Sequence, residues 1–165
     1  DTITVVQPTQ SIVNITGSTN VSCFGGNNGT ASALATGGTP GYTYLWSPGA
    51  ISGPNATGLS AGTYTVTSTD NNGCPATNTV VITEPSAPVS VTFSTTPVSC
   101  FGGSNGTATA IPAGGTPGYS YNWTTGSQIT QTATGLMAGN HTVVVTDSQG
   151  CTVTGIATVI QPPAH

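Results

Sequence analysis

The chain has neither lysine nor arginine, and its only acidic residues are Asp1, Asp70, Glu84 and Asp147 among 165 residues. An ordinary globular chain is about one-quarter charged. Binding to nucleic-acid phosphates or to anionic lipid headgroups relies on basic side chains, so the composition argues against both functions. The chain has no lysine for catalysis and too few acidic residues to suggest a catalytic pair of carboxylates. We therefore expect a protein that is not an enzyme.

Long apolar runs and helix-forming residues are also scarce. No apolar stretch approaches the roughly 18 residues of a membrane-spanning helix, and no direct membrane insertion is expected. No signal peptide is visible, which predicts either a mature chain or a fragment. The residues that are plentiful are Thr, Val, Ile and Tyr, which favour strands, and 23 glycines with 12 prolines, which favour turns. The composition thus predicts an all-β protein of many short strands.

The sequence repeats itself with an offset of 77 residues. Cys-Phe-Gly-Gly begins at Cys23 and again at Cys100, and Gly-Gly-Thr-Pro-Gly-Tyr ends at Tyr42 and again at Tyr119. The offset also relates Gln7-Pro8 to Glu84-Pro85. The expected organisation is the terminal strand of a preceding repeat, two full repeats and a short tail, at 1–8, 9–85, 86–162 and 163–165. The alternative for residues 1–8 is a strand donated to a neighbouring subunit.

Alternating apolar and polar residues between turn signals define the strands of one repeat. In the second repeat the predicted strands are 89–94, 107–111, 119–123, 141–146 and 151–160, with a Thr- and Gly-rich loop before residue 141. Short strands at this spacing are typical of a two-sheet sandwich.

One face of these strands carries the aromatic residues, and we predict that it is buried with Val66, Val143 and Val145. The predicted core aromatics are Tyr42, Tyr44, Trp46, Tyr119, Tyr121 and Trp123. The two tryptophans could instead form sugar-stacking platforms, but a strand tryptophan inside a sandwich is the favoured interpretation.

The four cysteines predict one disulfide in each repeat, Cys23–Cys74 and Cys100–Cys151, each spanning 51 positions. A unit this small needs such a covalent link, which contributes about 4 kcal/mol on the chain-entropy model. Free thiols and a Cys74–Cys100 pair are the alternatives. Metal-ligand spacings are missing, so no metal or other cofactor is expected. Disulfides predict a compartment outside the cytosol.

Three further residues carry chemistry of their own. Asp70 and Asp147 each stand alone in a turn; a Ca²⁺ site needs more oxygen ligands, so an Asx-turn role is favoured. His141 lacks a recognisable Ser–Asp pair, and we predict a histidine at the edge of the core rather than a catalytic base.

Four motifs in order resemble the SprB repeat family: Val-Ser-Cys-Phe-Gly-Gly-x-Asn-Gly-Thr, Gly-Gly-Thr-Pro-Gly-Tyr-x-Tyr-x-Trp, Leu-x-Ala-Gly-x-(Tyr/His)-Thr-Val and Asp-x-x-Gly-Cys. That family occurs in very long surface proteins of Bacteroidota, including gliding-motility adhesins. The resemblance covers both repeats, with His141 at the position of Tyr64 and Asn122 at that of Leu45. It implies an immunoglobulin-like sandwich, export by the type IX secretion system, and a role in surface filaments or adhesion.

Glycans are expected on the uncharged, hydroxyl-rich faces, because such a surface needs another source of solubility. Thr2 lies in a short O-glycosylation-like motif, and N-glycosylation sequons begin at Asn14, Asn20, Asn28, Asn55, Asn105, Asn122 and Asn140. Asn28 and Asn105 also read simply as turn residues before glycine. Phe24 and Phe101 are the candidate glycan-contact residues, because they lie in loops rather than strands.

Taken together, the sequence predicts a structural and adhesive repeat module at the cell surface, stiffened by the proline-containing linker 84–88. Its expected partners are neighbouring repeats or subunits of the same protein, with surface polysaccharide as a further candidate. The two competing functions are a polysaccharide-binding module and a fibre subunit that assembles through residues 1–8.

Overall fold

The computed structural model describes Ile3 and residues 6–164, and it divides them into two compact units. The first unit runs up to Val21 and continues over Gly25–Glu84, whereas the second comprises Ser22–Phe24 and the chain from Pro85 onward. The chain therefore passes between the units three times. Within the described part of the chain, no helix is long and apolar enough to cross a membrane.

Of the predicted terminal strand, residues 1–2 and 4–5 lie outside the described residues, as does Thr2 among the candidate glycosylation sites. Ile3 and residues 6–8 belong to no strand.

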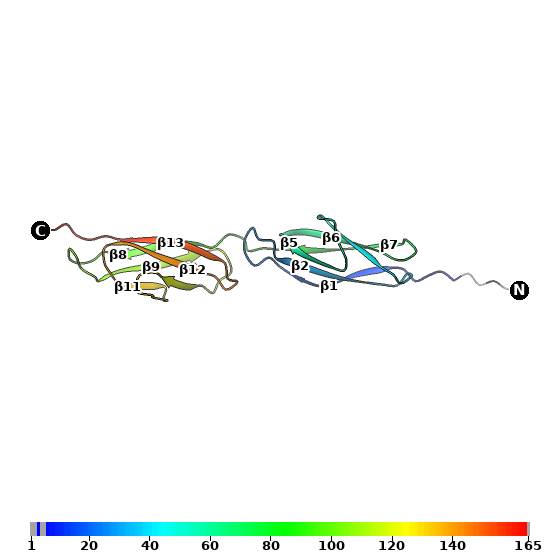
Figure 1. Cartoon of the computed structure of the whole chain (residues 1–165), viewed down its shortest axis with the longest axis horizontal. Helices are drawn as coiled ribbons and strands as arrows, with labels where there is room; N and C mark the ends of the chain where they lie inside the picture. Colours follow the sequence, from blue (N-terminus) through cyan, green and yellow to red (C-terminus); the bar gives the residue numbers. More distant parts are fainter. Residues whose placement is uncertain (1–2, 4–5, 165) are drawn as a thin grey trace. The chain divides into compact units, whose positions relative to one another are not determined.

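The first unit is a sandwich of two antiparallel sheets (Figure 1). One sheet has the order β1-β2-β5 and the other the order β4-β3-β6-β7. The strands are β1 (Ile12–Thr19), β2 (Gly29–Thr36), β3 (Thr43–Ser47), β4 (Ile51–Ser52), β5 (Asn55–Leu59), β6 (Gly62–Thr69) and β7 (Pro75–Ile82). Glycine and proline supply the turns between these strands.

The second unit has the same strand order, with β8-β9-β11 facing β10-β12-β13. Its strands are β8 (Ser90–Thr96), β9 (Gly106–Ala113), β10 (Ser120–Trp123), β11 (Thr132–Leu136), β12 (Gly139–Thr146) and β13 (Thr152–Val159). Each unit thus pairs a three-stranded antiparallel sheet with a second antiparallel sheet of three or four strands. This strand order makes each unit an immunoglobulin-like β-sandwich. The predicted all-β, immunoglobulin-like fold is confirmed.

One strand of the second unit was not predicted. The Thr- and Gly-rich stretch before residue 141 contains β11, which pairs with β9; the prediction of a loop there is wrong. The pairing register shifts between Ala133 and Leu136, so the two buried side chains of β11 are three positions apart. A bulge of this kind breaks the alternation by which a strand is recognised.

Each unit has its own apolar core, built around one tryptophan. Trp46 pairs with Val66 across β3 and β6, and Trp123 pairs with Val143 at the equivalent place in β10 and β12. Both indoles are 0 % exposed. Each indole Nε1–H donates to a backbone carbonyl at 3.0 Å, that of Gly53 or of Thr130. The polar edge of the ring is thereby satisfied while the rest is buried.

Candidate functional site

The only disulfide among the described residues joins Cys23 to Cys151, with their Cα atoms 5.7 Å apart. Both cysteines belong to the second unit, because that unit includes Ser22–Phe24. The predicted pairs Cys23–Cys74 and Cys100–Cys151 are therefore wrong, and so is the Cys74–Cys100 alternative. Cys74 and Cys100 are free and exposed.

Strand geometry explains why a pair within one repeat does not form. Residues 23–26 precede the start of β2, whereas the turn before Cys74 is bonded to Thr39, just beyond the end of β2. Eight residues of extended strand span about 26 Å, and a disulfide requires Cα atoms within about 7 Å. The two cysteines of a repeat thus lie at opposite ends of its sandwich.

The turn that carries each second cysteine is organised by a buried aspartate. The Asp70 carboxylate accepts hydrogen bonds from the backbone amides of Thr39 at 2.9 Å, Asn72 at 3.0 Å and Cys74 at 2.8 Å. Asp147 accepts the same set at the 77-residue offset, from Thr116, Gln149 and Cys151 at 2.8, 2.9 and 2.8 Å. This is the Asx-turn arrangement, extended by one bond to the preceding loop.

Glycine is required beside this carboxylate. Gly38 has φ +61°, and a Cβ at this position would lie 2.4 Å from Asp70 Oδ2. Gly115 repeats the arrangement next to Asp147, with φ +60° and 2.5 Å. The Gly-Gly-Thr-Pro-Gly motif thus allows the loop to close onto the aspartate.

Hydrogen bonding sets the charge state of both aspartates. The amides of Thr39 and Cys74 lower the pKa of Asp70, against a smaller opposing effect of burial. Burial raises the pKa of Asp147, but the amides of Thr116, Cys151, Gln149 and Gly150 together outweigh it and leave that pKa lowered. The carboxylate form is therefore favoured in the folded chain.

We expect replacement of Asp147 by asparagine to destabilise the second unit at pH 7 and to weaken its sensitivity to acid. A pKa that is lower in the folded than in the unfolded chain contributes stability above the unfolded value, near 4, and this contribution is lost as the pH falls through the folded value. Urea unfolding midpoints at pH 7, 4 and 3 measure the effect. Gln149→Ala, an exposed neighbour, is the control; equal pH profiles for Asp147→Asn and the unmodified chain would contradict the assignment.

The Cys-Phe-Gly-Gly loop is hydrogen-bonded to the side chain of the residue before the proline that ends each repeat. Gly25 N–H donates to the Glu84 carboxylate, and Gly102 N–H donates to Gln161 Oε1 at 3.1 Å. The backbone adds Val21 N–H to the Thr83 carbonyl at 2.9 Å and Val98 N–H to the Ile160 carbonyl at 3.0 Å. This role of Glu84 and Gln161 was not predicted, although the recurrence of Glu84-Pro85 as Gln161-Pro162 was its signal.

The two loop phenylalanines are both exposed, Phe24 by 49 % and Phe101 by 61 %. Phe24 and Cys23 line a hollow of about 340 Å³ in the second unit, completed by Pro88, Val89, Gly150, Cys151 and Thr152. Glycan contact by either ring stays a prediction.

The remaining aromatics of the predicted core are partly buried, and three of the four tyrosines have hydroxyls bonded to the backbone. Tyr42 and Tyr119 donate to the carbonyls of Gly37 and Gly114. Tyr44 Oη accepts from the amide of Ala35 at 2.9 Å. Burial, and to a lesser extent Tyr119, raises the pKa of Tyr121. Tyr44, Tyr119 and Tyr121 border the core around the tryptophan instead of filling its centre.

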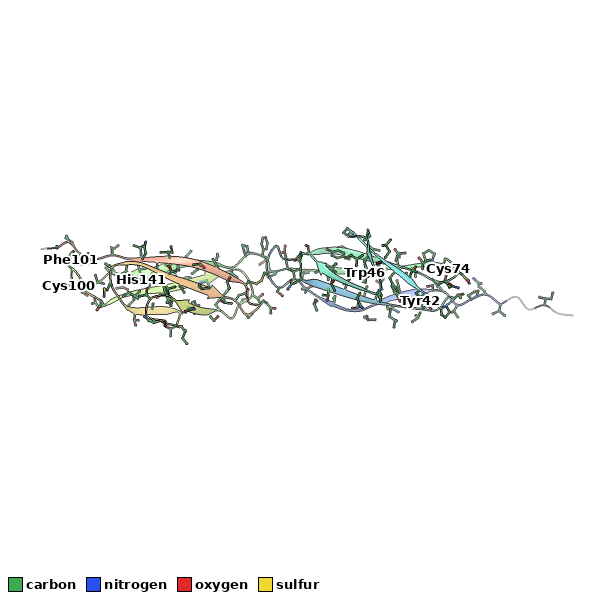
Figure 2. The ribbon with its side chains drawn as sticks, viewed as in Figure 1. Tyr42, Trp46, Cys74, Cys100, Phe101 and His141 are labelled. Carbon is green, nitrogen blue, oxygen red and sulfur yellow. A yellow bond between two sulfur atoms is a disulfide. The ribbon has the colours of Figure 1, made fainter. Side chains whose placement is uncertain are left out.

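His141 is buried, and it makes the same hydrogen bond as Tyr64, its counterpart in the first repeat. Its Nε2 lies 2.9 Å from the carbonyl of Met137, and Tyr64 Oη donates to the equivalent carbonyl of Ser60 at 3.2 Å. A carbonyl only accepts, so Nε2–H is the donor to Met137, and Nδ1 lies 3.0 Å from the Thr125 hydroxyl. With both nitrogens committed, His141 has a packing role at the edge of the core (Figure 2).

The seven sequon asparagines are all exposed. Several are nevertheless engaged: Asn20 Oδ1 accepts from the Thr83 amide, Asn105 bonds both the amide and the hydroxyl of Ser99, and Asn140 accepts from Thr158. Glycosylation of these sites stays a prediction. Over Ile3 and residues 6–164, no three His, Cys, Asp or Glu side chains gather as metal ligands.

The SprB repeat family matches the chain twice, over residues 14–51 and 92–128. These two segments are SprB repeats. Each match runs from the first strand of a sandwich, through the cysteine loop and the Gly-Gly-Thr-Pro-Gly motif, to the strand of the buried tryptophan and just beyond it. The resemblance noted in the sequence is confirmed.

No curated protein matches the chain in sequence. Among solved structures, it is similar to the fibronectin(III)-like modules of Clostridium thermocellum CbhA, at 17 % identity and a TM-score of 0.31, covering 93 % of this chain and 98 % of that one. It is also similar to domains 1–6 of the surface layer protein SbsC, at 16 % identity and a TM-score of 0.31, and the match covers 98 % of this chain and 29 % of that one. A third similar structure is Tp47, the 47-kilodalton lipoprotein of Treponema pallidum, at 12 % identity and a TM-score of 0.30. This match covers 94 % of this chain and 52 % of that one. The fold assignment rests on the strand order of the SprB repeats themselves.

Proposed function

We propose that this pair of SprB repeats is a structural module of an extracellular surface filament or giant adhesin, without enzymatic activity. The observation that carries the proposal is the incorporation of Ser22–Phe24 into the second unit, where Cys23 is bonded to Cys151. A repeat that is completed by residues of the preceding repeat is suited to an array of repeats in series. A binding or catalytic domain that acts alone has no need of this device.

Two further properties support the surface location. Structural disulfides form and persist outside the cytosol. The absence of lysine and arginine leaves no cleavage site for trypsin-like proteases in the printed sequence. Export by the type IX system and a part in gliding motility belong to this proposal through the SprB repeat family.

Surface exposure is tested on intact cells that produce the protein, with an antibody raised against the purified chain. We expect the antibody to label unpermeabilised cells and the label to disappear after treatment with proteinase K. A periplasmic protein, which should survive this treatment, is the control for cell integrity. Labelling that requires lysis would contradict the proposal.

A further inference from the structure

We propose that Cys74 and Cys100 are each one half of a disulfide to a further SprB repeat of the same polypeptide. Cys100 would bond to the cysteine equivalent to Cys151 in a repeat that follows, and Cys74 to the Cys-Phe-Gly-Gly cysteine of a repeat that precedes. The inference rests on the proposed function and deepens it, because it names the partner surface of each repeat.

The loop that presents Cys100 is built like the loop that presents Cys23. Cys100 follows Cys23 by 77 positions. Gly102 N–H is bonded to Gln161 as Gly25 N–H is to Glu84. The backbone bond at Val98 repeats the one at Val21. A loop of the same sequence and anchoring therefore presents a second thiol, and its Phe101 is even more exposed than Phe24.

The turn that presents Cys74 is likewise the equivalent of the turn that presents Cys151. The amides of Cys74 and Cys151 each lie 2.8 Å from Oδ1 of their aspartate. Cys74 is exposed, whereas Cys151, which has its partner, is half-buried. The four cysteines thus comprise two of each kind, and the observed bond joins one of each.

The surface around Cys74 also has room for a loop. In the second unit, Cys23 and Phe24 form part of the lining of the hollow beside Cys151. The corresponding hollow of the first unit measures about 380 Å³ and is lined by Gln7, Pro8, Thr9, Gln10, Ser11, Asp70, Asn72, Cys74 and Pro75. The hollow thus leaves space beside Cys74 for the loop of a preceding repeat.

Each free cysteine lies at an end of its own unit. In Figure 2, Cys74 lies at the end of the first unit from which the N-terminal segment departs. Cys100 and Phe101 lie at the end of the second unit from which the C-terminal segment departs. These are the ends at which a preceding and a following repeat attach through the main chain.

The bond forms by thiol–disulfide exchange with a small-molecule disulfide such as oxidised glutathione. The Cys100 thiolate attacks one sulfur of the oxidant, which gives a mixed disulfide and releases one thiol. The partner thiolate then attacks the Cys100 sulfur and displaces the second thiol. Two protein thiols are oxidised to one disulfide, and one oxidant molecule is reduced to two thiols.

The test is a chain extended directly after Pro162 by a second copy of residues 86–162, in which the added copy carries Cys100→Ser. This protein keeps residues 1–162 of the original chain and the 77-residue register. It is equilibrated with oxidised and reduced glutathione, and its free thiols are counted by alkylation and mass spectrometry. We expect one free thiol per chain, Cys74, because the original Cys100 is bonded to the added copy's Cys151.

The matched control carries Cys100→Ser in the original repeat as well, and it should show two free thiols, Cys74 and the added copy's Cys151. Three free thiols in the extended chain, or none in the control, would overturn the inference. Neither result bears on where the protein resides, so a failure here is distinguishable from a failure of the proposed function.

Discussion

Replacement of Trp123 by alanine should cost the second unit about 3–5 kcal/mol of its free energy of unfolding, the usual range for removing a buried tryptophan. The indole is completely buried, packs against Phe93 with ring centroids 6.2 Å apart, and donates to the Thr130 carbonyl. A single domain is stabilised by only about 5–15 kcal/mol in total. We therefore expect the unit to be unfolded, or close to it, at 37 °C.

The chain offers its own probes for this experiment. With Trp123 removed, Trp46 is the remaining tryptophan and reports on the first unit by fluorescence, while circular dichroism reports on both units. Asn122→Ala is the matched control, because Asn122 is exposed on the opposite face of the same strand, and such a change should stay within about 0.5 kcal/mol. Equal unfolding midpoints for Trp123→Ala and Asn122→Ala would contradict the central role of the indole.

The second large effect is expected from Cys23→Ser. The Cys23–Cys151 bond closes a loop over a sequence separation of 128, which corresponds to about 4–5 kcal/mol on the chain-entropy model. Calorimetry without reductant should show a clear drop in the unfolding temperature of the variant. Non-reducing peptide mapping of the unmodified chain should recover the Cys23 peptide joined to the Cys151 peptide.

Cys74→Ser is the matched control, since Cys74 is exposed and free. It should change the free energy of unfolding by no more than about 0.5 kcal/mol, as ordinary surface changes do. If Cys74→Ser destabilised the chain as much as Cys23→Ser, the result would support a Cys23–Cys74 disulfide and contradict the Cys23–Cys151 disulfide.

The sequence was a good guide to the strands and the core, for an identifiable reason. Alternation places Tyr44 and Trp46 on one face and Val143 and Val145 on the face that meets Trp123, and burial on one side of a sheet enforces that alternation. The bulged strand β11 escaped prediction because its buried residues Ala133 and Leu136 do not alternate.

The disulfide partners could not be derived from the repeat, because its symmetry allows two solutions. A Cys-Phe-Gly-Gly cysteine can pair with the second cysteine of its own repeat or with that of the next, and both patterns repeat every 77 residues. Strand length decides between them: β2 separates Cys23 from the turn of Cys74. The roles of Glu84 and Gln161 were missed for a related reason, since the repeated polar residue before proline does not indicate which loop its side chain bonds.

The Cys23–Cys151 bond also determines what happens when the two ends of the chain are pulled apart. Covalent load entering at the N-terminal side passes from Cys23 through the sulfur bridge to Cys151 and leaves toward residue 164, without travelling along the intervening backbone. The bypassed segment, with a contour length of roughly 430 Å when extended at about 3.4 Å per residue, contains both tryptophans and most of both cores. A single bridge therefore keeps this segment from extending under tension, and only reduction of that bridge releases its length.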